Sequence, residues 1–286
     1  VLQASESIIY GRYGYGMASF ENNLEIEKTR SAYAFDHVPE GQSYFIEESE
    51  AREIFPQIYA KAIENRVGMV RRNENWWEFR FREPGLKGGD PKSWFVKYQK
   101  NGEANGYLRY TINDAELTII ELIASSHEAY SSLWRLCLDM DLVDIIKAEH
   151  RPADEELKWM LADPRRLVEH SSDRYWVRLV DVKKALSQRS YSVDGSLTLE
   201  VKDSFLPWNQ EVVALRSESG ESSCATSNKT PDIVLSAGDL GAVYLGGINF
   251  STLVAAGRIE EITKGSVSKA NLMFSTKRKP WGFDGW

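Results

Sequence analysis

Hydrophobic and polar positions alternate every two residues along several stretches of the chain, which is the pattern of a strand buried on one face. Other stretches are short, unbroken apolar runs bounded by polar residues, and these also favour strands. The predicted strands cover residues 8–10, 23–28, 94–98, 106–110, 117–122, 143–148, 175–180, 196–201 and 211–215.

Two longer stretches have the spacing of an amphipathic helix. The first begins at Ser49 and carries Glu50 and Glu53 in its first turn, where acidic residues favour a helix start. Its predicted apolar side consists of Ile54, Ile58, Ala62 and Val67. The second covers residues 127–139, after a capping linker at residues 124–126. Shorter helices are predicted at residues 182–186 and 251–257, and polar loops around residues 84–89.

The order of these elements separates three segments: residues 1–36, 37–172 and 173–286. In the middle segment, the helix at residues 127–139 lies between strands with short connections on both sides. A strand, helix and strand joined in this way predict a sheet that is at least partly parallel. The sequence therefore predicts a mixed α+β or α/β fold.

The composition of the chain excludes several classes of partner and binding site. The net charge of −7 over 286 residues argues against nucleic acid as a partner and is compatible with a cationic substrate. The two cysteines, Cys137 and Cys224, are far apart and predict reduced thiols rather than a disulfide or a metal site. No apolar run has the length of about 18 residues that a membrane span requires. We therefore expect a cytoplasmic protein without a metal.

A glycine-rich stretch at residues 11–16 allows two interpretations. A phosphate-binding loop needs a strand before it and a helix start after it. Here the predicted strand at residues 8–10 precedes the glycines, but residues 17–21 open another strand, and no Lys-Ser or Lys-Thr pair follows. The alternative is that these glycines bend a tight connection between strands.

The longer pattern Ser-Glu-x-x-Ile-Tyr-Gly-Arg-Tyr-Gly-Tyr-Gly-x-Ala at residues 5–18 resembles the enhanced intracellular survival (Eis) family of GNAT acetyltransferases. Residues 175–186 and 240–259 are similar to the C-terminal domain of the same family. This resemblance implies tandem GNAT-like mixed sheets flanked by helices, followed by a sterol-carrier-like α+β domain. It assigns residues 1–36 to the end of the catalytic GNAT domain, 37–172 to a second GNAT-like domain, and 173–286 to the sterol-carrier-like domain.

The resemblance also implies transfer of acetyl from acetyl-CoA to the amine of a cationic small molecule, similar to an aminoglycoside or a polyamine. Tyr10 would be the general acid, and Ser5 and Glu6 would lie along the cofactor. The C-terminal carboxylate of Trp286 would be the second catalytic group. An acidic residue precedes the last one in some relatives, whereas Gly285 stands here and Asp284 comes one position earlier. A homo-oligomer, a hexamer built from trimers, is also implied.

The chemistry is compatible with these roles. An amine with a pKa of about 10.4 must lose a proton before it attacks a thioester, and a carboxylate can receive that proton. A tyrosine hydroxyl can donate a proton to the leaving thiolate. Direct attack needs no nucleophilic residue, so the chain's scattered histidines are expected to be structural or exposed. These histidines are His37, His127, His150 and His170.

The middle segment has no glycines or arginine at the junction of residues 122–129, where a GNAT domain would hold pyrophosphate, and Glu128 would repel the phosphates. The competent loop is therefore expected before Val1, with much of the catalytic domain absent from this chain. Two alternatives stay open. The sterol-carrier-like domain could be a non-enzymatic module that binds a lipid or another ligand, or the chain as given could be inactive.

Overall fold

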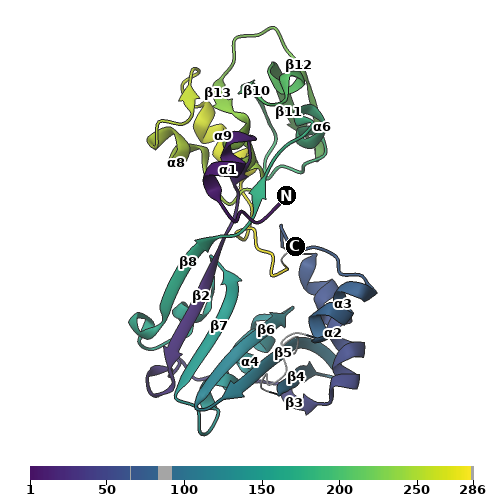
Figure 1. The fold of residues 1–286 in the computed structure, drawn as a ribbon, viewed down its shortest axis with the longest axis vertical. Coiled ribbons are helices and arrows are strands. Elements are labelled where there is room, and N and C mark those ends of the chain that lie inside the picture. Colours follow the sequence, from purple (N-terminus) through teal and green to yellow (C-terminus); the bar gives the residue numbers. More distant parts are fainter. Residues whose placement is uncertain (65, 83–91, 285–286) are drawn as a thin grey trace. The chain divides into compact units, whose positions relative to one another are not determined.

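The structure is a computed structural model that describes residues 1–64, 66–82 and 92–284 (Figure 1). The chain forms two compact units. One unit consists of Glu21–Ser171, and the other combines Val1–Phe20 with Ser172–Trp286. We call them the central unit and the terminal unit.

The central unit is built on a seven-stranded sheet with the strand order β3-β4-β5-β6-β7-β2-β8. Strands β6 and β7 pair in parallel. The pairs β3–β4, β4–β5 and β5–β6 are antiparallel. The strands are β2 (Phe20–Glu27), β3 (Gln42–Ile46), β4 (Ser93–Lys100), β5 (Glu103–Asn113), β6 (Glu116–Ala124), β7 (Ile145–Pro152) and β8 (Val168–Asp173). The helices are α2 (Glu48–Ile63), α3 (Glu74–Arg82), α4 (His127–Asp139) and the short α5 (Leu157–Met160).

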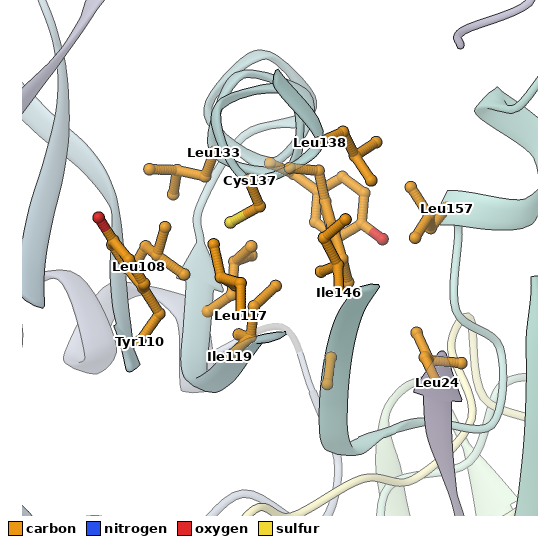
Figure 2. Close-up of a cluster of buried hydrophobic side chains, with 14 of the residues drawn as sticks. Leu24, Leu108, Tyr110, Leu117, Ile119, Leu133, Cys137, Leu138, Ile146 and Leu157 are labelled. Atoms are coloured by element: carbon orange, nitrogen blue, oxygen red, sulfur yellow. The ribbon is translucent and has the colours of Figure 1, made fainter. Parts of the chain in front are cut away.

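Helices α2 and α4 pack on opposite faces of this sheet. Phe55 of α2 stacks on Tyr107 of β5 with ring centroids 3.9 Å apart. The next residue, Leu108, belongs to the core cluster under α4, as alternation along a strand requires. Figure 2 shows Leu133, Cys137 and Leu138 on the side of α4 that faces the strands. The core thus lies between α4 and β4 to β7.

The terminal unit contains two sheets. A two-stranded antiparallel ribbon joins β1 (Gly16–Met17) to β9 (Trp176–Val177). A five-stranded sheet has the order β12-β11-β10-β13-β14, with β10 and β13 parallel. Its strands are β10 (Gly195–Lys202), β11 (Val212–Glu218), β12 (Glu221–Thr226), β13 (Ile233–Ser236) and β14 (Glu260–Glu261). The helices are α1 (Ser7–Arg12), α6 (Val182–Ser187), α7 (Ala237–Tyr244), α8 (Phe250–Ala255) and α9 (Ser266–Phe274).

The predicted mixed fold is confirmed, and the helix at residues 127–139 has the predicted bounds. Its parallel β6–α4–β7 arrangement is also confirmed. The first predicted helix is present as α2, but its predicted apolar side is partly wrong. Val67 lies beyond the helix and is exposed, whereas Phe55 and Tyr59 are buried. The loops predicted around residues 84–89 lie outside the described residues.

The strand predicted at residues 8–10 is wrong, because these residues lie in helix α1. The carbonyl of Glu6 accepts hydrogen bonds from the amides of Ile9 (3.0 Å) and Tyr10 (3.5 Å), which gives a helical turn. Two consecutive isoleucines favour a strand by intrinsic preference, but such preferences are weak and tertiary context overrides them. A helix of this length is not stable alone, and none of its residues is fully buried in the described part of the chain.

The chain passes from the terminal unit into the central unit after Phe20, whereas the sequence analysis placed the first domain boundary at residue 36. Strand β2 continues from there into the sheet of the central unit and pairs with β7. The second change of unit, at Ser172, lies next to the predicted boundary at residues 172–173. The identity of the three domains stays a prediction.

Candidate functional site: the opening helix and the C-terminal tail

Helix α1 carries Tyr10, and the two residues directly before the helix are Ser5 and Glu6, which are also predicted site residues. Tyr10 is half-buried, and its ring meets the ring of Tyr15 edge-on, with centroids 6.1 Å apart. Ser5 and Glu6 are exposed at the start of the helix. The side chain of Glu6 makes no cap hydrogen bond, so only its backbone carbonyl closes the first turn.

The glycines after α1 serve the chain's own packing. Gly14 has φ of +75°, a backbone conformation that glycine adopts without strain. A Cβ atom on Gly16 would come within 1.8 Å of the carbonyl oxygen of Gly238 in α7. The helix lies before these glycines and a strand follows them, which is the reverse of a phosphate-binding loop. The alternative of a connection between two strands is also wrong as stated, because helix α1 precedes the glycines, which instead form a tight turn between this helix and β1.

A buried ion pair supports this turn. Arg178 donates from Nη2 to both carboxylate oxygens of Asp203, at 2.8 and 2.7 Å, and from Nη1 to the carbonyl of Gly14 at 3.3 Å. Burial alone would raise the pKa of Asp203, but hydrogen bonds from Arg178, Leu206 and Asn209 outweigh it and lower that pKa. Asp203 is therefore ionised and holds Arg178 in place. The sequence analysis did not identify this pair.

The last described residues form a tail that is fixed by hydrogen bonds to its backbone. Arg174 donates to the carbonyls of Gly282 (3.3 Å) and Phe283 (2.6 Å). The hydroxyl of Tyr175 donates to the carbonyl of Asp284 at 3.0 Å. The amide oxygen of Gln3 is oriented toward the guanidinium of Arg174 at 2.9 Å, because a guanidinium can only donate.

Packing fixes the same tail. Trp281, Phe283 and Asp284 are all buried, as the aromatic-rich sequence indicated. Gly282 is pressed against Tyr175, since a Cβ atom there would lie 2.0 Å from the tyrosine oxygen. Trp286 and Gly285 lie outside the described residues. The tail is thus held in the terminal unit at least as far as Asp284.

Sequence reasoning missed the residues that hold the tail, Arg174 and Tyr175. Tyr175 belongs to an apolar stretch that was predicted to be a strand, and its hydroxyl has no signature in a single sequence. Arg174 comes directly before that stretch, where an arginine is ordinarily a solvated residue. Their role appears only when residues more than a hundred positions apart along the sequence come together.

The start of α4, in the central unit, is the place where a pyrophosphate loop would lie in a GNAT fold. Ser126 caps this helix by accepting a hydrogen bond from the amide of Ala129 at 3.2 Å. The carboxylate of Glu128 accepts from the backbone amides of Glu40 (2.7 Å) and Gly41 (3.1 Å) and from Tyr98 and Lys100. Hydrogen bonds from Lys100 and Tyr98 lower the pKa of Glu128 to about 2.

In the ranges 1–64, 66–82 and 92–284, no helix has the length and apolar character needed to cross a membrane. Over the same ranges, no three histidine, cysteine or acidic side chains gather as metal ligands would. Cys137 is part of the core under α4, where burial raises the pKa of its thiol.

Two protein families match parts of the chain. Residues 68–179 match the acetyltransferase (GNAT) domain, and residues 182–282 match the sterol carrier protein domain. An uncharacterized N-acetyltransferase of Streptomyces coelicolor is 32% identical over 295 residues, which cover 98% of this chain and 70% of the relative. The N-acetyltransferase Eis of Mycobacterium tuberculosis is 28% identical over 270 residues, which cover 90% of this chain and 64% of Eis.

A solved structure agrees with these relatives. The crystal structure of Eis1 from Mycobacterium abscessus superposes on this fold with a TM-score of 0.85 and 30% sequence identity. The match covers 100% of this chain and 72% of that chain. The chain belongs to the Eis-type N-acetyltransferases of the GNAT superfamily, with a GNAT acetyltransferase domain followed by a sterol carrier protein domain.

Proposed function

We propose that this N-acetyltransferase transfers acetyl from acetyl-CoA to a primary amine of a cationic small molecule, similar to an aminoglycoside or a polyamine. Tyr10 is the proposed general acid, and the C-terminal carboxylate of Trp286 is the proposed base. Ser5 and Glu6 are proposed to lie along the cofactor. A cytoplasmic homo-oligomer, with the hexamer of the family resemblance, is part of the same proposal.

The proposed step is a direct transfer. The ammonium group of the acceptor gives one proton to the C-terminal carboxylate, and the free amine attacks the thioester carbonyl. The new C–N bond forms as the C–S bond breaks, and the hydroxyl of Tyr10 supplies a proton to the thiolate that leaves. The nitrogen then gives its second proton to the Tyr10 phenolate, and the C-terminal carboxyl releases the first proton to solvent, which restores both groups. In general, a tyrosine hydroxyl with a pKa of about 10 can donate a proton and a terminal carboxylate with a pKa of about 3.5 can accept one near neutral pH.

The observation that supports this proposal best is the anchored tail. A terminal carboxylate can act as a base only if the preceding residues keep it in one place. Arg174 and Tyr175 bind three successive carbonyls of the tail, and the aromatic side chains of Trp281 and Phe283 are buried. Tyr10 belongs to the same compact unit as this tail. The net charge of −7 would also favour the approach of a cationic acceptor.

The residues at the start of α4 support the proposal that the central unit does not bind the cofactor. A bound pyrophosphate needs free amide N–H groups at a helix start, but here Ser126 accepts the hydrogen bond of the Ala129 amide, and the carboxylate of Glu128 lies in the first turn of α4. Glu128 also adds a negative charge that would repel a phosphate. The described residues of this junction do not fit CoA, so we assign no cofactor role to the central unit.

The test is thiol release from acetyl-CoA in the presence of an amine panel that contains a polyamine, an aminoglycoside and a neutral amine. Tyr10→Phe removes the proposed acid and should lower kcat by about 10²–10⁴-fold, with little change in KM. Adding one glycine after Trp286 moves the terminal carboxylate and should have a comparable effect.

The matched control is Tyr13→Phe, a tyrosine three residues later whose ring contacts Phe205 with centroids 5.1 Å apart. It should retain the parent kcat. If Tyr10→Phe and the extended chain both keep the activity of this control, the proposed roles of Tyr10 and the terminal carboxylate are wrong. Equal rates with the neutral amine and the polyamine would contradict a cationic acceptor.

A further inference from the structure

Helix α1 by itself provides little to hold Tyr10 in place. The helix has six residues, no side-chain cap and no fully buried residue in the described part of the chain. A helix this short is not stable alone in water. Tyr10 lies in its last turn, so the position of this tyrosine depends on what fixes the chain directly after the helix.

After α1 the chain turns back onto Tyr10. The carbonyl of Tyr10 accepts hydrogen bonds from the amides of Tyr13 (3.1 Å) and Tyr15 (3.3 Å). Gly14 allows this turn, because its φ of +75° is a conformation that glycine adopts without strain. The turn brings the ring of Tyr15 edge-on against the ring of Tyr10, with centroids 6.1 Å apart and planes at 78°. This separation lies in the range of attractive aromatic pairs, about 4.5–7 Å.

The backbone of Tyr15 is fixed on both sides by the rest of the terminal unit. On one side, the carbonyl of Gly14 accepts a hydrogen bond from Nη1 of Arg178 at 3.3 Å. On the other side, Gly16 pairs with Val177 and lies so close to α7 that a Cβ atom would not fit there. Val177 and Arg178 are neighbours in the chain, so one short segment holds both sides of Tyr15.

A buried acidic side chain fixes the guanidinium of Arg178. Asp203 accepts from Nη2 of Arg178 with both carboxylate oxygens, at 2.8 and 2.7 Å. Asp203 also accepts from the backbone amide of Leu206 at 2.9 Å and from the side-chain amide of Asn209 at 3.1 Å. The side chains of the ion pair are only 4% and 1% exposed. Attraction between two buried charges repays their desolvation only in a well-defined geometry with further hydrogen bonds, which this pair has.

We propose that Arg178, Asp203 and Tyr15 are positioning residues for the general acid Tyr10. The ion pair fixes the turn at Gly14, the turn fixes the ring of Tyr15, and this ring sets the orientation of the Tyr10 side chain. The inference rests on the proposed role of Tyr10 as the acid. It goes beyond that role because it gives the sterol carrier protein domain, to which Asp203 belongs, a part in orienting a group of the acetyl-transfer chemistry.

Steady-state kinetics with acetyl-CoA and the amine panel gives the first test. Arg178→Met and Tyr15→Leu should each lower kcat roughly tenfold with little change in the KM for acetyl-CoA, because a misplaced acid weakens stabilisation of the transition state. Tyr15→Phe, which keeps the ring, should recover most of this loss. In the Tyr10→Phe background, Arg178→Met should cause little further loss, because both changes act through the same hydroxyl. An equal loss in both backgrounds would overturn the proposal.

A second measurement does not depend on activity. The protein is labelled with 3-fluorotyrosine at its 13 tyrosines, and the fluorine resonance of Tyr10 is identified by its loss in Tyr10→Phe. In Arg178→Met and in Tyr15→Leu this resonance should move from its position in the parent spectrum, and an unmoved resonance would overturn the proposal. A parent-like kcat in Tyr10→Phe would instead contradict the proposed acid, so the two failures are distinguishable. If Arg178→Met does not fold, Tyr15→Leu at its half-buried position provides both readouts.

Arg189→Met is the matched control, because Arg189 is a half-buried arginine of the same unit that also donates to backbone carbonyls. These carbonyls belong to Tyr244 (2.8 Å) and Phe274 (2.7 Å), which lie outside the turn after α1. We expect the parent kcat and an unmoved Tyr10 resonance in this variant. Equal changes in Arg189→Met would overturn the proposal, because a general loosening of the unit would then explain them.

Discussion

The two compact units differ in what their buried charges bind. In the central unit, buried acidic side chains are paired with arginines of the same unit. Glu121 lies 2.9 Å from Arg72 and accepts a hydrogen bond from Tyr107 at 2.8 Å. Burial alone would raise the pKa of Glu121, but the charges of Arg72 and Arg80 outweigh it and keep that pKa below its ordinary value.

A second buried network in the central unit also pairs an acidic side chain with an arginine of the same unit. Glu155 accepts from Nε of Arg151 at 3.1 Å and from the hydroxyl of Tyr130. Arg151 also donates to the carbonyl of Leu122 at 2.9 Å. Such closed networks hold the sheet and its helices in one arrangement and leave these charges no ligand to attract.

The terminal unit also has a buried ion pair, Arg178 with Asp203, but its arginines in addition bind backbone carbonyls. Arg174 donates to backbone carbonyls of the tail, and Arg178 supports the turn at Gly14. The buried charges named for the central unit pair within that unit, whereas the residues proposed for acetyl transfer belong to the terminal unit. The following predictions test this difference, from the largest expected effect to the smallest.

Arg151→Met should give the largest loss of stability. It leaves the carboxylate of Glu155, which is 1% exposed, without its cation in the interior. Removing one partner of a buried ion pair ordinarily costs about 3–5 kcal/mol in the free energy of unfolding. Urea unfolding followed by circular dichroism measures this cost, and the midpoint should fall with little change in slope.

Two further variants show whether the buried charge is the cause. Arg166→Met removes an arginine from an exposed pair with Asp163 and should cost at most about 1 kcal/mol. The double variant Arg151→Met with Glu155→Met should recover much of the loss, because no unpaired charge then stays buried. A double variant as unstable as Arg151→Met alone would mean that lost packing, and not charge, explains the effect.

Arg174→Leu should affect catalysis more than folding. It removes the donors that bind the carbonyls of Gly282 and Phe283, so the tail and the proposed terminal base lose their fixed position. A displacement of this kind can lower kcat by about 100-fold, while the KM for acetyl-CoA should change little. Steady-state kinetics with the best amine of the panel measures both constants.

The conservative variant Arg174→Lys keeps a positive charge but loses the forked donor geometry, and we expect partial recovery of kcat. Arg216→Leu is the matched control, because Arg216 pairs with Glu218 on the surface and both side chains are about two-thirds exposed. A parent-like kcat in Arg174→Leu would show that the anchored tail does not position the proposed base.

The sequence predicted most strands of the central unit and the bounds of α4, because alternation and the N-cap at Ser126 are local signals. It missed helix α1, because the consecutive Ile8 and Ile9 favour a strand and no capping side chain marks the start. It missed α3 as well, whose aromatic and charged residues do not form a regular apolar stripe.

The candidate site was predictable only in part. The motif at residues 5–18 identified the family, since its pattern of residue types is local and specific. The tail anchor and the contact that fixes the turn after α1 could not be derived in the same way. Arg174 meets Phe283, and Arg178 meets Gly14, only because the fold joins distant segments. A single sequence without related sequences carries no signal for such pairs.

Glu128→Gln should have the smallest effect on stability. The way in which this effect depends on pH is what tests the role of the carboxylate. The pKa of Glu128 in the folded protein is lowered to about 2, below the ordinary value of about 4.3 for an unfolded chain. The charged carboxylate therefore stabilises the fold above that ordinary value, and its contribution is lost as the pH falls toward about 2. At neutral pH the parent protein should melt slightly above Glu128→Gln, and the two melting temperatures should converge in acid.

Glu48→Gln is the control for this comparison, because Glu48 pairs with Arg52 on the surface of α2 at 2.8 Å. Surface pairs contribute little, so its melting temperature should stay close to that of the parent protein. If Glu128→Gln follows the parent at every pH, the carboxylate does not stabilise the start of α4. In that case the hydrogen bonds from the amides of Glu40 and Gly41 to Glu128 would add nothing measurable to the stability of the fold.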